Sequence, residues 1–200
     1  MKYTIYKPNA KNSGSAFSFD LTTGKNDTPV IFVNMILQYS WNDQYKNGSF
    51  KENAKNPEKS AVFALTPTEA GEIISSVRSR VPFTAFHKKD DNTTIINFTP
   101  WDKKRKIRGK DGDQFFETPA FGLSVAKNSS QKFTLPLEAG ETEMLVLLLE
   151  EYIKWSFDAA ARQYKPREDG GQSNNSQSNN SKPQEKTKLD DDLEDDSIPF

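Results

Sequence analysis

The first feature of this sequence with a chemical use is a dense run of bases that follows a tryptophan. Six of the eight residues from 103 to 110 are Lys or Arg, and Trp101 lies two positions before them. Basic side chains contact phosphates and an aromatic face stacks on any nucleobase, so the combination is typical of binding to single-stranded nucleic acid. A solvated basic loop is the alternative interpretation. The predicted contacts are Trp101, Lys103, Lys104, Arg105, Lys106, Arg108 and Lys110.

Other aromatic residues have the same potential use, because the chain contains 23 of them, more than a core of this size needs. We expect stacking residues at strand ends that are flanked by polar or basic residues, although core packing is the alternative for any single ring. The expected contacts are Tyr39, Trp41 and Phe86, with Lys88 and Lys89 extending the basic surface. Core positions are assigned to Phe32, Phe63 and Phe133, and a hydrogen-bonded structural role to His87.

The C-terminal segment 190–200 combines negative charge with a small apolar end. Like charges repel, and three apolar side chains cannot offset the entropy lost on ordering, so the segment is not expected to fold alone. It can dock on a partner protein that offers a hydrophobic pocket with Lys or Arg at its rim, whereas a solubilising tail is the alternative. The predicted partner-binding residues are Asp190, Asp191, Asp192, Glu194, Asp195, Asp196, Ile198, Pro199 and Phe200.

Composition excludes several kinds of site. The chain has no Cys and a single His, which excludes disulfides and thiolate metal sites and argues against a Ser-His-Asp triad. Asp102, Asp111 and Asp113 are weak candidates for a metal-dependent nuclease, because they alternate with bases in ordinary turn chemistry. The sequence has no Gly-rich phosphate loop. We therefore expect no enzymatic activity and no cofactor.

Charge and hydropathy predict three regions. Residues 1–166 carry 23 bases and 19 acids, a net charge of +4, whereas the remaining residues carry a net charge of −5. The start of the chain has no apolar signal segment, and the longest apolar run, 144–149, is too short to cross a bilayer, so we expect a cytoplasmic protein without membrane contact. These features predict a binding domain at 1–165, a flexible linker at 166–189 and an interaction tail at 190–200.

Hydrophobic periodicity and turn residues predict strands followed by a helix, twice along the chain. The expected strands are 15–21, 30–41, 61–65, 82–87, 93–99, 114–126 and 130–135, with a basic loop at 101–113. A helix from Thr66 to Arg80 is predicted because Thr66 and Glu69 can form a capping box around Pro67. The second predicted helix, Glu141–Gln163, is apolar on nearly all sides at 144–149, which indicates packing against more than one surface. The segment 63–72 also recurs loosely at 133–141, so the predicted fold class is α+β with two antiparallel strands-then-helix halves.

Several of these segments resemble the Whirly family of single-stranded DNA-binding proteins. The similar segments are Gln38–Trp41, Val62–Gly71, Phe86–His87 and Phe121–Val125. The resemblance implies two antiparallel four-stranded sheets packed across each other, each followed by a helix, with oligomers formed through the helices. The sequence departs from the family at 12–17, where the lysines of a basic family motif are missing, and at 44–59, which is an insertion.

The segment 190–200 resembles the ends of a different group, the bacterial single-stranded DNA-binding proteins, which finish in acidic residues followed by Ile-Pro-Phe. Together the resemblances imply a bacteriophage-encoded protein of the host cytoplasm that binds single-stranded DNA without sequence preference. They also imply that the tail recruits replication, recombination or repair proteins, and that a homo-oligomer forms through Glu141–Gln163. The alternatives are a transcriptional regulator of melted promoter DNA, a single-strand binder with the OB-fold, and an acidic-tailed interaction protein without a nucleic-acid role.

Overall fold

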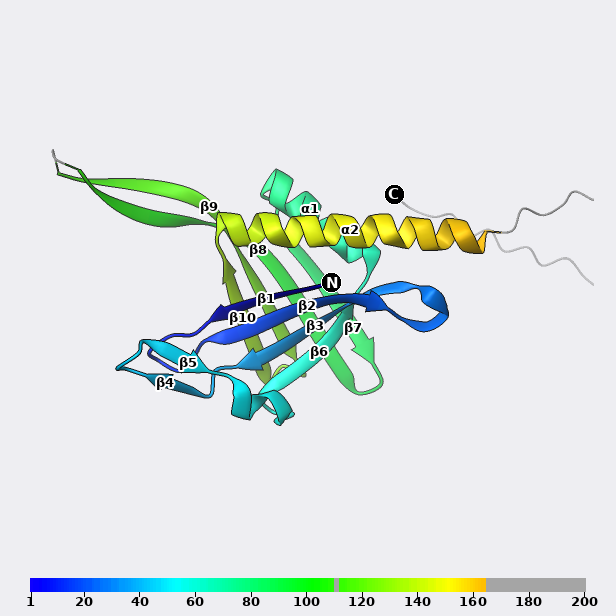
Figure 1. Cartoon of the computed structure of the whole chain (residues 1–200), viewed down its shortest axis with the longest axis horizontal. Helices are drawn as coiled ribbons and strands as arrows, with labels where there is room; N and C mark the ends of the chain where they lie inside the picture. Colours follow the sequence, from blue (N-terminus) through cyan, green and yellow to red (C-terminus); the bar gives the residue numbers. More distant parts are fainter. Residues whose placement is uncertain (110–111, 165–200) are drawn as a thin grey trace, which may run out of the picture. The chain divides into compact units, whose positions relative to one another are not determined.

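The computed structural model describes residues 1–109 and 112–164, and places two four-stranded antiparallel sheets and a small two-stranded sheet there (Figure 1). The first sheet has the order β1 (Lys2–Lys7), β2 (Ser15–Thr23), β3 (Pro29–Leu37), β6 (Ser60–Leu65). The second has the order β10 (Gln131–Leu137), β9 (Gly112–Lys127), β8 (Asn92–Gly109), β7 (Phe83–Lys89). The small sheet pairs β4 (Ser40–Asn42) with β5 (Asn47–Ser49). The predicted contact Lys110, the predicted linker 166–189 and the predicted tail 190–200 lie outside the described residues.

Each large sheet is followed in the chain by a helix, α1 (Pro67–Ser79) after β6 and α2 (Ala139–Gln163) after β10. Two short 3₁₀ helices, Lys25–Asp27 and Lys51–Lys55, lie in the connections of the first half. This order confirms the predicted α+β class with its repeated strands-then-helix halves. The OB-fold alternative is wrong, because two separate four-stranded sheets replace a single five-stranded barrel.

The core lies where the inner faces of both sheets meet the two helices. Alternate residues of a strand point to opposite faces, so Phe17 and Phe19 enter the core from the first sheet and Phe98 and Leu123 from the second. Complete burial of such a side chain contributes about 1.5–3 kcal/mol. The helix α2 adds Leu149, which is fully buried.

The same alternation corrects one core prediction. Phe63 and Phe133 are buried, at 8% and 0% exposure, as predicted. Phe32 is 40% exposed, because its neighbours Ile31 and Val33 take the inward positions of β3. A strand that is apolar at consecutive positions does not reveal which set of residues faces the core.

The predicted continuous strand 30–41 is interrupted after Leu37. Gln38 is buried, and its side chain accepts a hydrogen bond from Asn9 N at 2.8 Å and donates one to Ser40 O at 3.0 Å. A Cβ atom at Gly14 would lie 2.4 Å from Gln38 Oε1, so glycine permits this close approach. A buried amide requires such partners, and these contacts hold Gln38 at the point where the chain leaves the first sheet and enters the β4–β5 hairpin.

The predicted capping box of α1 is confirmed. Thr66 Oγ1 accepts a hydrogen bond from Glu69 N at 3.2 Å, and Glu69 Oε2 accepts one from Thr66 N at 2.9 Å. Glu69 also contacts His87 Nε2 on β7, so the predicted structural role of this histidine is confirmed as well. Partial burial alone raises the pKa of the Glu69 carboxyl, but hydrogen bonds from Thr66 and His87 outweigh it and leave the pKa below its ordinary value.

The helix α2 begins two residues earlier than predicted and has two different sides. One side packs on the core through Leu145 and Tyr152, whose hydroxyl donates to Leu65 O at 2.9 Å. The other side leaves Met144 and Leu147 exposed, at 52% and 59%. The apolar sequence of this helix is therefore explained by the core on one side only, within the described residues.

The predicted basic loop at 101–113 is wrong, because Trp101–Gly109 belongs to β8 and Gly112 opens β9. The two strands form a continuous antiparallel ladder from Thr94 opposite Lys127 to Gly109 opposite Gly112. Gly112 has φ of +115°, a conformation that residues with a Cβ rarely adopt, and this allows the chain to reverse. Charge density indicates exposure but says nothing about strand pairing, so the sequence interpretation missed the hairpin.

Candidate nucleic-acid interface

The outer face of the second sheet carries exposed aromatic rings among polar side chains. Its inner face is buried through residues such as Ile96 and Phe98, so the odd-numbered residues of β8 point outward. Phe86 on β7 is opposite Ile95 and shares this outer face, with 60% exposure. Trp101 lies further along the same face, with 39% exposure. We call this outer face of β7 and β8, which includes Phe86 and Trp101, the platform.

Beyond the platform, β8 and β9 pair only with each other among the strands that the structure describes. The pairing of β7 with β8 begins at Phe98, and β10 pairs with β9 only up to Phe121. From there β8 and β9 form a two-stranded ribbon, which Figure 1 shows projecting from the sheet. We call residues 102–109 and 112–119 the arm. Its side chains are exposed except for the half-buried Lys103 and Thr118, and Gly109 is not assessed.

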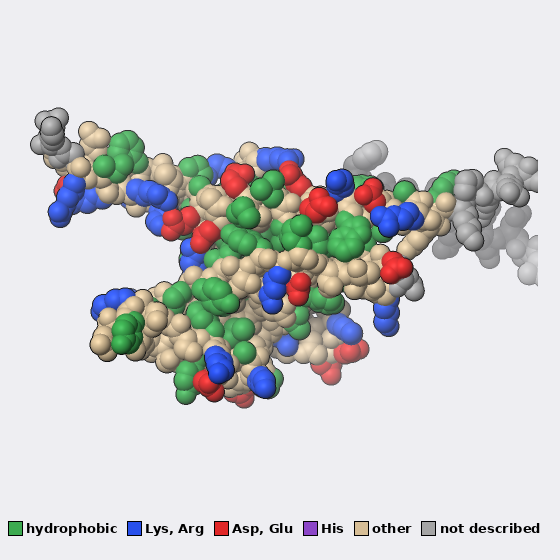
Figure 2. Space-filling view, viewed as in Figure 1, with side chains coloured by type: hydrophobic (Ala, Val, Ile, Leu, Met, Phe, Trp, Pro, Cys, Tyr) green, Lys and Arg blue, Asp and Glu red, His purple; other side chains and the backbone are tan. Residues whose placement is uncertain are grey.

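The arm has two faces. Directly paired residues of its antiparallel strands lie on the same face. One face continues the platform and is called the platform face, and the opposite one is called the back face. Figure 2 shows Lys and Arg side chains along the arm with hydrophobic side chains between them. The register places Lys103, Arg105, Ile107 and Phe116 on the platform face, and Lys104, Lys106, Arg108 and Phe115 on the back face.

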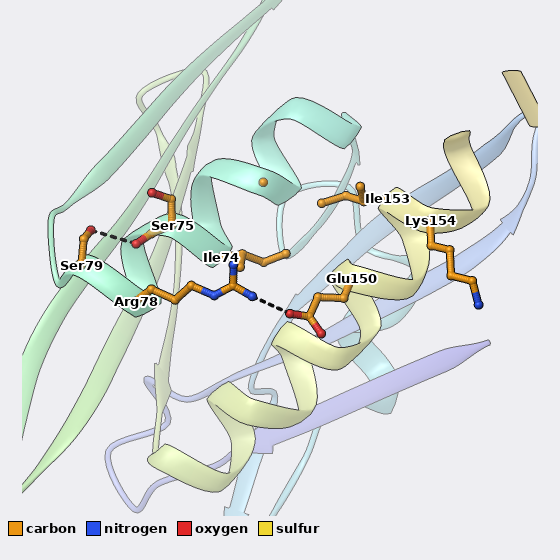
Figure 3. Close-up of a pocket in the computed structure, with 8 residues that line it drawn as sticks. Ile74, Ser75, Arg78, Ser79, Glu150, Ile153 and Lys154 are labelled. Atoms are coloured by element: carbon orange, nitrogen blue, oxygen red, sulfur yellow. Dashed lines mark hydrogen bonds and ion pairs between the residues drawn. The ribbon is translucent and has the colours of Figure 1, made fainter. Parts of the chain in front are cut away.

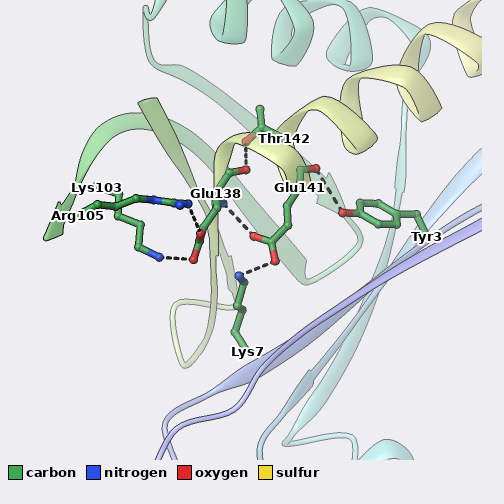
Figure 4. Close-up of polar contacts among 7 residues, drawn as sticks. All are labelled: Tyr3, Lys7, Lys103, Arg105, Glu138, Glu141 and Thr142. Atoms are coloured by element: carbon green, nitrogen blue, oxygen red, sulfur yellow. Dashed lines mark hydrogen bonds and ion pairs between the residues drawn. The ribbon is translucent and has the colours of Figure 1, made fainter. Parts of the chain in front are cut away.

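The root of the arm is held by Glu138, the residue just before α2. Its carboxylate pairs with Lys103 and, at 2.9 Å, with Arg105 Nη2 (Figure 4). The hydrogen bond from Lys103 is the main cause that lowers the pKa of the Glu138 carboxyl, so Glu138 is ionised at neutral pH. In the same cluster Lys7 Nζ lies 2.6 Å from Glu141 Oε1, in the first turn of α2. One acidic residue therefore occupies two of the predicted phosphate contacts.

The remaining bases of the arm are held weakly. Lys106 Nζ lies 2.5 Å from Asp113 Oδ2 and Lys104 Nζ lies 3.7 Å from Glu117 Oε1, both on the back face. Arg108 forms no ion pair with any residue in the ranges 1–109 and 112–164. Exposed ion pairs contribute about 0–1 kcal/mol each, so a phosphate can replace these carboxylates.

The structure brings only some of the predicted contacts together. Phe86, Trp101 and the arm share one sheet, and Lys88 lies on the same face at the end of the platform far from the arm. By strand alternation Lys89 points to the opposite face. Tyr39 and Trp41 lie apart from these residues, at the β4–β5 hairpin, where Trp41 Nε1 donates to Asp43 Oδ1 at 3.2 Å.

Three exposed apolar residues of the arm were missed by the sequence interpretation. Ile107, Phe115 and Phe116 are 56%, 69% and 46% exposed. The available signal was the pair of glycines at 109 and 112, which marks a turn between two β-prone stretches. Recognising that turn would have placed the two phenylalanines on opposite faces of one ribbon.

Among the described residues, no group of three His, Asp or Glu side chains is arranged to hold a metal ion. Neither α-helix in this part of the chain combines the length and the apolar character that a bilayer crossing requires.

Comparison with known proteins supports the fold. No family model matches the chain, and no curated protein matches it either. Among solved structures, WHY3 from Arabidopsis thaliana aligns with a TM-score of 0.50 and 14% identity over 81% of this chain and 91% of that one. The plant transcriptional regulator PBF-2 aligns with a TM-score of 0.50 and 16% identity over 83% of this chain and 88% of that one. At such low identity these matches establish a shared fold, the one that the Whirly resemblance predicts.

Proposed function

We propose that the described part of the chain binds single-stranded DNA without sequence preference. The observation that carries this proposal is the platform, an open sheet face whose rings at Phe86 and Trp101 lead into the basic arm. Each exposed ring stacks on a nucleobase of any identity, and the Lys and Arg side chains of the arm contact the phosphates.

A titration with fluorescently labelled oligo-dT tests the proposal. Phe86→Ala and Trp101→Ala should each weaken binding by about 1–3 kcal/mol, since that is the value of one stacked base. Tyr164→Ala is the matched control, because Tyr164 is a 74% exposed ring just beyond α2, away from the platform. Affinity should also fall steeply as salt rises. Equal affinity of the two platform variants and the wild type would contradict the proposal.

We further propose that the protein is a homo-oligomer assembled through the helices. The exposed Met144 and Leu147 line a largely apolar groove with Met1 and Tyr3. A second groove runs between α1 and α2, where Ile74 and Ile153 face each other beside the 2.7 Å ion pair of Arg78 with Glu150 (Figure 3). Burial of Met144 and Leu147 between copies would explain the second apolar side of α2.

The tail 190–200 completes the proposal. It recruits replication, recombination or repair proteins, and it competes with DNA for the basic surface, as suits a bacteriophage protein in the host cytoplasm. Deletion of 190–200 should leave oligo-dT affinity unchanged or slightly higher and should abolish capture of the partner proteins. A large fall in oligo-dT affinity would exclude this division of roles.

A second candidate function is transcriptional regulation at melted promoter DNA. It is favoured by one observation, the fold shared with the plant transcriptional regulator PBF-2. Competition between oligo-dT and duplex promoter fragments separates the two functions, because a regulator prefers particular sites and the proposed binder prefers any single strand. The absence of all nucleic-acid binding would instead favour an acidic-tailed interaction protein.

A further inference from the structure

The back face of the arm has no role in the proposed single-strand path. That path follows the platform and the platform face of the arm, where Arg105 and Phe116 are opposite each other. The back face repeats the same pattern, because Lys106 is directly opposite Phe115, whose ring is 69% exposed. A basic side chain beside an exposed ring is therefore present on both sides of one two-stranded ribbon.

We propose that the arm is a strand-separating wedge that binds the fork between duplex and single-stranded DNA. This inference rests on the proposed function, and it assigns one strand of the fork to each face. A single strand passes along one face of a ribbon and leaves the other unused. Two strands that diverge around the ribbon place a phosphate backbone and an unpaired base on each side, which is what the paired Arg105–Phe116 and Lys106–Phe115 positions match.

The root of the arm is braced on both faces, as a wedge requires. Glu138 holds Lys103 and Arg105 on the platform face. On the back face, Asp102 Oδ1 accepts a hydrogen bond from Arg80 Nη2 at 2.8 Å, and the same nitrogen lies 3.3 Å from Trp101 O. An isolated two-stranded ribbon is only marginally stable in water, so these contacts stiffen the arm where it leaves the sheet.

Charge decides between DNA and a second copy of the chain as the occupant of the back face. Lys104 and Lys106 are paired with Glu117 and Asp113 of the same face, whereas Arg108 has no ion pair among the described residues. Pairing two arms through the back face would cover the ring of Phe115 but would also bury the charge of Arg108 without an opposite charge, which opposes such an interface. A nucleic acid strand supplies the opposite charge and a flat ring, so it complements both features of the face.

The adjacent phenylalanines provide a matched test with two substrates. One is labelled oligo-dT, and the other is a fork with a duplex stem and two unpaired oligo-dT ends. Phe115→Ala should weaken fork binding about fivefold or more and leave oligo-dT binding within about twofold, because one stacked base is lost only at the fork. Phe116→Ala should weaken both to a similar extent. Circular dichroism checks that both variants fold.

A second measurement follows the opening of a DNA hairpin that carries a fluorophore and a quencher. The back-face variant with Lys106→Ala and Arg108→Ala should open the hairpin more slowly than the wild type at equal occupancy of oligo-dT. Equal losses of oligo-dT binding in Phe115→Ala and Phe116→Ala, or no loss of fork binding in Phe115→Ala, would overturn the wedge. Failure of the wild type to bind oligo-dT would instead refute the proposed function, so the two failures are distinct.

Discussion

Replacement of Glu138 by glutamine tests whether the bases at the root of the arm are available to DNA. In the free protein, the single negative charge of the Glu138 carboxylate is paired with both Lys103 and Arg105. A phosphate competes with this carboxylate for both basic side chains, which are 34% and 51% exposed. Glutamine has nearly the same shape but no charge, so Glu138→Gln removes the competitor and leaves both bases in place. We expect stability and DNA affinity to change in opposite directions.

The size of the effect follows from the exposure of the three groups. The side chains of Lys103, Arg105 and Glu138 are 34%, 51% and 35% exposed, so water screens both pairs substantially. Each pair is then worth about 0.2–1 kcal/mol, and Glu138→Gln should lower the free energy of unfolding by about 0.4–2 kcal/mol. The same free energy no longer opposes binding, which corresponds to an oligo-dT affinity about two- to thirtyfold higher.

Urea denaturation and oligo-dT titration at one low salt concentration measure the two changes. Glu141→Gln is the matched control, because Glu141 lies at the same end of α2 but pairs with Lys7, outside the arm. It should lower stability without a comparable gain in affinity. Weaker DNA binding by Glu138→Gln would refute the reasoning, since it would mean that Glu138 holds the arm in the orientation that binds. An equal gain in both variants would reduce the effect to net charge.

Four further predictions concern the fold and the assembly. The pKa of Glu69 is lower in the folded chain than in the unfolded one, so its carboxylate adds stability. This stability is lost as pH falls below about 4.5 and through the folded pKa. Glu69→Gln should therefore reduce the dependence of the unfolding free energy on pH in urea titrations between pH 3 and 6. Tyr152→Phe removes the buried hydrogen bond from the hydroxyl to Leu65 O and should cost about 0.5–1.5 kcal/mol in the same assay. Leu145→Ala should cost about 2–5 kcal/mol because the side chain is buried. Leu147 is 59% exposed on the same helix, so Leu147→Ala should cost little stability in a single copy but should shift the proposed oligomer toward smaller species in light scattering.

Much of the fold is predictable because local chemistry and tertiary structure agree. Thr66, Pro67 and Glu69 determine the start of α1 by themselves, since a capping box uses only groups within one turn. The two strands-then-helix halves follow from the spacing of apolar runs. The orientation of Phe32 was not predictable in this way, because β3 is apolar at successive positions and only the packing of the second layer selects the inward set.

The candidate site was predicted in composition but not in geometry. Trp101 and the bases after it were found from charge and residue type, whereas their conformation was wrong, because pairing with β9 is a long-range property. Phe115 and Phe116 were missed for the same reason. Exposed aromatic residues in a sequence look like core residues until the partner strand and the covering layers are known. Tyr39 and Trp41 show the converse, since they were predicted as stacking contacts at the end of one long strand, whereas the structure places them at the β4–β5 hairpin and not on the platform.

The fold and the proposed site depend on different parts of the same two strands. Up to Phe98 and Phe121, β8 and β9 are flanked by β7 and β10 and contribute to the core. Past those residues no other described strand pairs with them and most of their side chains are exposed, so packing alone does not explain why the ladder continues to Gly109. Strands that extend without neighbours expose unpaired edges and gain little stability, which makes them a liability unless a ligand uses them. Tests of the function of this chain should therefore begin with the arm, because the length of this ladder is more informative than the fold that the chain shares with WHY3 and PBF-2.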